Sequence, residues 1–190
     1  AANFNGTETI TYIVSDGTDT STGTLTITVT SVNDAPVAIA DTASVDEDTS
    51  LTVDVILNDT DVDITDTLTL ILATPDGSGT VSVNADGVSV DYTPAANFNG
   101  TETITYTVSD GELSDITGTL TITVTAVNDA PVTIADIATV TEDAAITNID
   151  VVSNDTDVEG DTLTLTAATT DSNGTVSVNA DGVSVDYTPA

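Results

Sequence analysis

Apolar and polar residues alternate along most of this chain. Leu120, Ile122 and Val124 occupy one side of a run in which every intervening position is threonine. A period of two residues is typical of a half-buried β-strand, and no segment shows helical spacing. The alternation recurs in seven segments of one stretch of chain, at residues 37–45, 51–57, 67–73, 80–83, 88–92, 103–108 and 119–125. The pattern predicts an all-β protein.

Turn residues separate these segments. Asp86-Gly87 lies between two alternating runs, and Asn99-Gly100 and Asp110-Gly111 mark two further connections. Seven short antiparallel strands in about 95 residues predict a two-sheet Greek-key sandwich of the cadherin or immunoglobulin-like type. The predicted core contains the apolar positions Leu51, Val53, Leu68, Leu70, Ile104, Tyr106, Leu120, Ile122 and Val124.

The chain repeats itself. The string AANFNGTETITY at residues 1–12 recurs unchanged at residues 95–106, and NADGVSVDYTPA at residues 84–95 recurs at residues 179–190. These offsets define a period of about 95 residues, which is the size of one sandwich domain. We therefore expect tandem seven-stranded sandwiches that follow one another like beads on a string.

Two Asn-Asp-Ala-Pro segments, at residues 33–36 and 128–131, mark the predicted domain boundaries. Residues 1–32 then hold the last two strands of a first repeat, residues 33–127 a complete repeat, and residues 128–190 the first five strands of a third. The two incomplete repeats complement each other. We expect the third repeat to expose core positions that the absent strands would cover, namely Val151, Leu163, Leu165, Val183 and Val185.

Two hypotheses account for the incomplete repeats. In the first, which we favour, the chain is a segment of a continuous repetitive polypeptide, because it starts and stops at the same phase of the repeat without a terminus signal. In the second, the chain is a separate subunit, and the last two strands of one copy complete the sheets of the next by strand complementation. Both hypotheses predict that identical repeats associate head to tail into a fibre.

The charge of the chain has one sign only. Its 190 residues include 32 Asp and Glu but no Lys, Arg, His, Cys, Met or Trp, which gives a formal charge of −32. Without imidazole, thiol or amine side chains, most nucleophilic mechanisms are excluded, and the negative charge disfavours binding to nucleic acids and to anionic lipid surfaces. No uninterrupted apolar run exceeds four residues, so we expect no membrane insertion. Two carboxylates suffice for glycoside hydrolysis, but the lack of Trp argues against a sugar cleft, so we predict no enzymatic activity. The natural small partner is a cation.

Several motifs in a fixed order resemble one family. VNDAPV, NDTDVD, GTVSV and DYTPAANFNGTETITYTVSDG, followed by a threonine-rich strand, resemble the cadherin-like (VCBS-type, immunoglobulin-like) tandem repeats of large bacterial RTX-type surface adhesins and biofilm-associated proteins. The resemblance implies a secreted protein of the bacterial cell surface. It also implies a spacer or stalk that holds a terminal adhesive domain, outside these residues, away from the cell. The alternative is a lectin-like, ligand-binding adhesion module, against which the near-identity of the copies argues.

Acidic loops are predicted to converge where successive domains join, because an immunoglobulin-like sandwich gathers its loops at its two ends. Calcium takes six to eight oxygen ligands, and without His or Cys no other common metal fits as well. Around Pro131 the candidate ligands are Glu47, Asp48, Glu102, Asn128, Asp129, Asp155 and Asp157; around Pro36 they are Asn33, Asp34, Asp59 and Asp61, beside Glu8 and Asp63.

The resemblance to cadherins supports part of this ligand set. The cadherin linker pattern Asp-x-Asn-Asp-Asn-x-Pro is shortened to Asn-Asp-Ala-Pro at both boundaries, and the Asp-x-Asp pair survives as Asp59 with Asp61 and as Asp155 with Asp157. The Asp-Arg-Glu element cannot be present in a chain without Arg, so the number of ions stays open. The alternative interpretation is that these acids are solvated loop residues that keep a secreted fibre dispersed.

Overall fold

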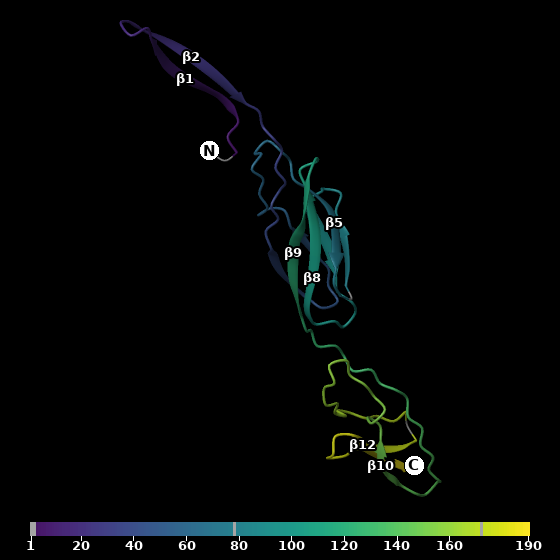
Figure 1. Ribbon diagram of the computed structural model, residues 1–190. Helices are drawn as coiled ribbons and strands as arrows, with labels where there is room; N and C mark the ends of the chain where they lie inside the picture. Colours follow the sequence, from purple (N-terminus) through teal and green to yellow (C-terminus); the bar gives the residue numbers. More distant parts are fainter. Residues whose placement is uncertain (1–2, 78, 172) are drawn as a thin grey trace. The chain divides into compact units, whose positions relative to one another are not determined.

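The computed structural model describes residues 3–77, 79–171 and 173–190 (Figure 1). Strands and loops make up the described residues, as the two-residue alternation predicts, and the chain falls into two compact units, unit 1 at residues 1–126 and unit 2 at residues 127–190. In the part of the chain that the structure describes, no helix is long and apolar enough to cross a membrane. The all-β prediction is confirmed.

Unit 1 begins with a two-stranded antiparallel hairpin of β1 (Gly6–Ser15) and β2 (Thr20–Val29). The turn between the strands is stabilised by Asp16, whose carboxylate accepts the backbone N–H groups of Thr18 and Asp19 at 2.9 and 2.8 Å. Because the two strands pair only with each other, both faces of the hairpin remain largely exposed.

Seven further strands of unit 1 form two sheets, as the seven alternating segments predict. The strands are β3 (Asp41–Asp46), β4 (Leu51–Asp54), β5 (Thr69–Pro75), β6 (Thr80–Val83), β7 (Ser89–Thr93), β8 (Gly100–Ser109) and β9 (Ser114–Thr125). One sheet has the order β3-β9-β8-β5 and the other has the order β4-β7-β6. We call these seven strands and their loops the central sandwich; β8 and β9 lie side by side in its larger sheet (Figure 1).

One strand pair differs from the antiparallel arrangement expected. β3 pairs with β9 in parallel, with Asp41 opposite Leu120 and Asp46 opposite Thr125. β3 lies in one sheet, and β4, the next strand along the chain, lies in the other. No hairpin connects β3 to β9, so nothing imposes an antiparallel direction on this pair. Alternation along a strand reports which face is buried and carries no information on direction, which is why the sequence did not reveal this pair.

The core of the central sandwich is aliphatic with two tyrosines. Ile104, Leu120 and Ile122 are fully buried, and Tyr92 and Tyr106 are the largest buried side chains. The predicted core is confirmed at Leu70, Ile104, Tyr106, Leu120, Ile122 and Val124, whereas Leu51, Val53 and Leu68 are half-buried.

Two glycines leave room for the buried tyrosine rings. A β-carbon at Gly118 would overlap the ring of Tyr106, and one at Gly79 would overlap the ring of Tyr92. In the hairpin, Gly23 stands in the same relation to Tyr12. The repeat therefore keeps this ring-on-glycine packing even where the surrounding core is absent.

Unit 2 contains β10 (Ile146–Asp150), β11 (Gly174–Val178) and β12 (Ser184–Pro189), which form one sheet in the order β10-β12-β11. Five strands were expected, and the described residues at 136–141 and 164–170 form none. Their counterparts in the central sandwich, β3 and β5, pair only with β9 and β8, and residues 128–190 include no equivalents of those two strands.

The expected exposure of core positions in unit 2 is found in part. Val151, Leu163, Leu165 and Val183 are half-buried. Val185 is buried, contrary to expectation, because β12 lies between β10 and β11 and is covered on both edges.

Candidate metal centre

The acidic loop between β4 and β5 is fastened to the start of the central sandwich. Val37 and Thr60 exchange two backbone hydrogen bonds, with N···O distances of 2.7 and 3.0 Å. The Asp59 carboxylate accepts the backbone N–H of Ile39 at 2.7 Å. These bonds hold the loop against the segment that follows the Asn-Asp-Ala-Pro linker.

Three carboxylates of this loop lie close together. Ligand oxygens of Asp61, Asp63 and Asp66 all lie within 4.8 Å of one another, and the three side chains are partly buried. Local turns produce this grouping: the Asp63 N–H donates to the Asp61 carboxylate at 2.7 Å, and the Asp66 N–H donates to the Asp63 carbonyl oxygen at 2.9 Å. Asp residues favour such turns because their side chains accept backbone N–H groups two residues on.

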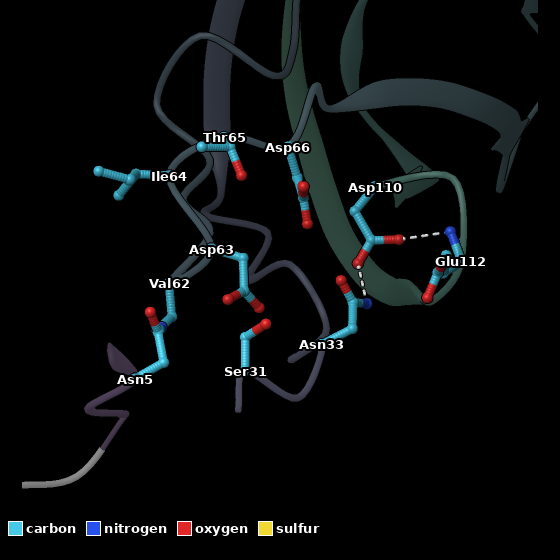
Figure 2. A pocket seen from close by; sticks show the side chains of 10 residues that line it. All are labelled: Asn5, Ser31, Asn33, Val62, Asp63, Ile64, Thr65, Asp66, Asp110 and Glu112. Carbon is cyan, nitrogen blue, oxygen red and sulfur yellow. Dashed lines mark hydrogen bonds between the residues drawn. The ribbon is translucent and has the colours of Figure 1, made fainter. Parts of the chain in front are cut away.

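The linker reaches the same place. The backbone N–H of Asp34 donates to Asp63 Oδ2 at 2.8 Å, and Asn33 Nδ2 donates to Asp110 Oδ2 at 2.8 Å. Asp110 belongs to the turn between β8 and β9. Asp63, Asp66 and Asp110 line a shared hollow of ≈ 860 Å³. Figure 2 shows the side chains of these three residues. Three separate parts of unit 1 therefore contribute oxygens to this end of the central sandwich.

Two carboxylate oxygens here are shielded from solvent and have no hydrogen-bond partner among the described residues, namely Asp59 Oδ2 and Asp61 Oδ2. A buried acceptor without a partner costs about 1–3 kcal/mol, and more when it is charged. The sequence contains no Lys, Arg or His, so no basic side chain of this chain supplies the missing positive charge.

The Tyr106 hydroxyl lies at the inner edge of the same cluster. Its oxygen is 3.0 Å from the Ile39 carbonyl oxygen, 3.1 Å from Asp41 Oδ2 and 3.2 Å from Asp59 Oδ1. A single hydroxyl proton cannot serve all three acceptors. Burial raises the pKa of Asp41 and of Asp59 above the ordinary value, and burial next to these two carboxylates also raises the pKa of Tyr106. Negative charge is therefore costly at this end of the sandwich.

Unit 2 repeats this arrangement. The Asp155 carboxylate accepts a backbone N–H at 2.7 Å, and the Asp129 N–H donates to Glu159 Oε1 at 3.3 Å. Asp157 Oδ1 accepts the N–H of Glu159 at 3.1 Å, while Asn128 Nδ2 donates to the Asp129 carbonyl oxygen at 2.7 Å. Asp129 Oδ2 is shielded from solvent without a partner among the described residues. The linker and the acidic loop are thus joined in both units.

Two further candidates lie where β9 ends. Glu47 is buried, and its backbone N–H donates to the Thr125 carbonyl oxygen at 2.9 Å. Asp48 adopts a positive φ of 59° and accepts the Asn97 N–H through Oδ1 at 3.1 Å. Both residues therefore help to close the loop between β3 and β4.

Glu102 lies inside the sandwich at the same end, with 2% of its surface exposed. Its carboxylate accepts the Tyr92 hydroxyl at 2.6 Å and the backbone N–H of Gly79 at 3.2 and 3.3 Å. Glu102 is thus held by hydrogen bonds within the fold, and a role as metal ligand would add to these bonds.

The structure groups the predicted ligands into three sets. Asn33, Asp34, Asp59 and Asp61 lie at one end of the central sandwich, and Glu47, Asp48 and Glu102 at the other; Asn128, Asp129, Asp155 and Asp157 lie together in unit 2. A shared site around Pro131 stays a prediction.

Sequence reasoning missed Asp66 and Asp110 as members of the first set. Asp66 follows Asp61 and Asp63 with the spacing Asp-x-Asp-x-x-Asp, which was a usable signal. Asp110 starts the Asp-Gly turn between the last two strands, which belongs to the same end of the fold as the acidic loop.

The first set suits a calcium ion. Calcium binds oxygens at about 2.3–2.6 Å, so two ligands of one ion lie at most about 5 Å apart. The oxygens of Asp61, Asp63 and Asp66 meet this condition. The donor set contains carboxylate, amide and backbone oxygens, which are the ligands that calcium prefers, and none of the nitrogen or sulfur ligands of zinc or copper.

The sandwich, its partial copy in unit 2 and the repeated acidic ends define the chain as tandem immunoglobulin-like repeats. The family model for the bacterial cadherin-like domain matches residues 33–126, and the model for the bacterial Ig domain matches residues 128–190. Residues 33–126 are therefore a cadherin-like repeat and residues 128–190 an immunoglobulin-like repeat of the kind found in bacterial surface proteins. Such domains are typical of extracellular proteins and are typically non-catalytic, and bacterial cadherin-like domains generally bind calcium.

Solved structures add only distant likenesses. The endo-fucoidan hydrolase MfFcnA4 from glycoside hydrolase family 107 is 21% identical over 98% of this chain and 30% of its own, with a TM-score of 0.37. The surface layer protein SbsC, domains 4–9, is 19% identical over 97% of this chain and 31% of its own, with a TM-score of 0.36. The chain spans less than a third of either protein. No curated protein matches.

Proposed function

We propose that this chain is a non-catalytic spacer segment of a secreted bacterial surface protein, in which calcium bound at the acidic ends stiffens the joints between successive repeats. The observation that carries the proposal is the direct attachment of the linker to the acidic loop, through the Asp34 N–H and Asp63. An ion held by this loop acts on the segment that joins one repeat to the next.

The residues that would hold the ion in unit 1 are Asp61, Asp63 and Asp66, with Asp59 adjacent. A divalent cation would supply the positive charge that the chain lacks and a partner for the oxygens that are shielded without one. Since Asn33 and Asp34 are hydrogen-bonded to Asp110 and Asp63, fixing the loop would restrict the linker as well.

The spacer hypothesis also rests on the two surfaces of the sandwich. Exposed threonines lie on the outer faces of β8 and β9, namely Thr101, Thr105, Thr123 and Thr125, and the acidic clusters lie at the ends of the sandwich. Near-identical repeats with the same loops are suited to a protein in which the number of repeats determines the length of the spacer.

Calcium titration of the chain tests the proposal. We expect binding by isothermal titration calorimetry, a higher melting temperature in calcium than in EDTA, and a narrower distribution of lengths in small-angle scattering. Asp63→Asn, which replaces one oxygen of the cluster with an amide nitrogen, should weaken binding, whereas Asp19→Asn in the β1–β2 turn should leave it unchanged. Melting curves and scattering profiles that are identical in calcium and in EDTA would refute the proposal.

A further inference from the structure

Tyr106 extends from the core of the central sandwich to its acidic end. Only 1% of the residue is exposed, and a β-carbon at Gly118 would overlap its ring. Its hydroxyl contacts both Asp59 in the acidic loop and Ile39 in the segment that precedes β3. The core of the sandwich and the candidate metal centre therefore share one side chain.

The Asp59 carboxylate uses its two oxygens differently. Oδ1 accepts the backbone N–H of Ile39 at 2.7 Å and lies 3.2 Å from the Tyr106 hydroxyl oxygen. Oδ2 is shielded from solvent, and none of the described residues forms a hydrogen bond with it. The carboxylate is thus held through Oδ1, while Oδ2 has no partner in the part of the chain that the structure describes.

Tyr106 reaches Asp59 by two routes. Its hydroxyl contacts Asp59 Oδ1 directly, and it also lies 3.0 Å from the carbonyl oxygen of Ile39, whose N–H donates to the same Oδ1. A hydroxyl proton on either acceptor therefore ties the Ile39 backbone and the Asp59 carboxylate together. The third neighbour of the hydroxyl, Asp41 Oδ2 at 3.1 Å, belongs to β3.

We propose that Tyr106 is a positioning residue of the calcium site, whose hydroxyl holds the Asp59 carboxylate by Oδ1 so that Oδ2 stays available to the cation. This inference rests on the proposed calcium site. Groups that bond to a metal ligand fix its orientation without touching the metal, and their loss typically weakens metal affinity about 10–100-fold.

The surroundings of the hydroxyl favour positioning over a purely structural role. A tyrosine that only had to satisfy its own hydroxyl would need one acceptor, and the Ile39 carbonyl oxygen provides it. The hydroxyl lies instead within 3.2 Å of two carboxylates that repel each other, those of Asp41 and Asp59. Since the chain has no Lys, Arg or His, only neutral donors can hold acidic side chains in place before a cation binds.

Calcium titration of matched variants tests the inference. All chains carry Asp155→Asn and Asp157→Asn, which disable the acidic loop of unit 2, so that calorimetry reports on unit 1. Tyr106→Phe keeps the ring, removes the hydroxyl and should raise the Kd for calcium about 10–100-fold. Tyr92→Phe removes the other buried hydroxyl, whose acceptor is Glu102, and should leave the Kd unchanged.

A double-mutant cycle identifies the residue through which Tyr106 acts. Asp59→Asn alone should weaken calcium binding, because it removes one carboxylate from the site. If the Tyr106 hydroxyl acts by orienting Asp59, then Tyr106→Phe should weaken binding much less in the Asp59→Asn chain than in the chain that retains Asp59. Equal effects of Tyr106→Phe in the two chains would contradict the inference.

Stability without calcium separates positioning from a structural contribution. In EDTA, Tyr106→Phe and Tyr92→Phe should both lower the melting temperature of the central sandwich, because each removes a hydroxyl that is hydrogen-bonded inside the fold. Only Tyr106→Phe should also reduce the rise in melting temperature that calcium produces. Binding is measured well below both transitions. Gly118→Ala, which displaces the Tyr106 ring and keeps its hydroxyl, is a second variant and should weaken binding as well.

Terbium, which occupies oxygen sites of the calcium type, provides a spectroscopic measurement. The chain has no Trp, so terbium luminescence excited through the protein depends on its four tyrosines. At saturating terbium, the luminescence should persist in Tyr92→Phe and fall strongly in Tyr106→Phe, because the Tyr106 hydroxyl lies beside a ligand of the ion.

The two possible failures are distinguishable. If the chain binds calcium with the same affinity in Tyr106→Phe as in Tyr92→Phe, the positioning role is overturned and the calcium site stands. If the chain with an intact unit 1 site binds no calcium, the proposed calcium site and the positioning role are overturned together.

Discussion

Leu70 and Leu165 occupy equivalent positions of the repeat, but Leu70 is buried and Leu165 is half-buried. Replacing each leucine with alanine therefore measures how much the completed core contributes to stability. Leu70 is 4% exposed within the core of the central sandwich, and its N–H donates to the Gly87 carbonyl oxygen at 2.7 Å. Leu165 makes the matching bond to Gly182 at 2.6 Å but is half-buried, and its side chain lines a cleft of unit 2. The two leucines make the same backbone hydrogen bond, and they differ in the strands that cover their side chains.

Leu70→Ala removes a side chain whose surface is almost wholly shielded from water, and such truncations cost about 2–5 kcal/mol because a cavity is added to the lost transfer free energy. The central sandwich should have a total stability of about 5–15 kcal/mol, so its melting temperature should fall by about 10 °C or more. Leu165→Ala, in contrast, opens no closed cavity and should cost markedly less.

Differential scanning calorimetry of the full chain, together with urea denaturation followed by tyrosine fluorescence, measures both effects. Thr121→Ala on the outer face of β9 is the control, and it should shift the transition little because threonine there packs against no core. Equal losses at Leu70 and Thr121 would show that the assignment of inner and outer faces is wrong. Equal losses at Leu70 and Leu165 would show that β8 and β9 do not complete the core.

Three further predictions concern single contacts. Tyr92→Phe removes the hydroxyl that donates to the buried Glu102 and should cost about 1.5–3 kcal/mol in urea denaturation, because a charged acceptor loses a partner. Gly118→Ala should lower the melting temperature more than an average surface substitution, since the new methyl group would overlap the Tyr106 ring. Hydrogen bonds from the backbone N–H of Val88 and from Ser89 lower the pKa of Asp86 below its ordinary value. The ionised carboxylate therefore stabilises the fold above the unfolded pKa of about 3.9, and this stabilisation is lost as the pH falls through the lower folded value. Asp86→Asn should therefore lower the melting temperature at pH 6 and converge with wild type in acid.

Strand positions followed from the sequence because a two-residue period directly reports a half-buried surface. Leu120, Ile122 and Val124 are buried as their alternation with threonine indicates. The strands of unit 2 at residues 136–141 and 164–170 were expected for the same reason and did not form. Alternation shows that a segment is suited to a sheet, but backbone hydrogen bonds need a neighbouring strand, and whether one is present is not encoded locally.

The sequence predicted which kinds of residue form the candidate site, but it identified only some of the residues themselves. Asp59 and Asp61 were identified by their spacing. Asp66 and Asp110 join them because two turns fold back to the linker, which depends on the tertiary path of loops far apart in sequence. Burial of Glu102 against Tyr92 was unexpected for the same reason, because its place in an alternating threonine-rich strand does not reveal which loop covers it.

The parallel pair of β3 and β9 has a mechanical consequence. These are the first and last strands of the central sandwich, and their register runs from Asp41 opposite Leu120 to Asp46 opposite Thr125. A pulling force applied through the chain on either side enters β3 at its start and leaves β9 at its end, so it slides the two strands past each other. The hydrogen bonds between them are then loaded in shear and must break together, whereas a hairpin pulled from its open end would release them one at a time. A sandwich built in this way resists a force applied between its first and last strands more strongly than one whose terminal strands separate one hydrogen bond at a time.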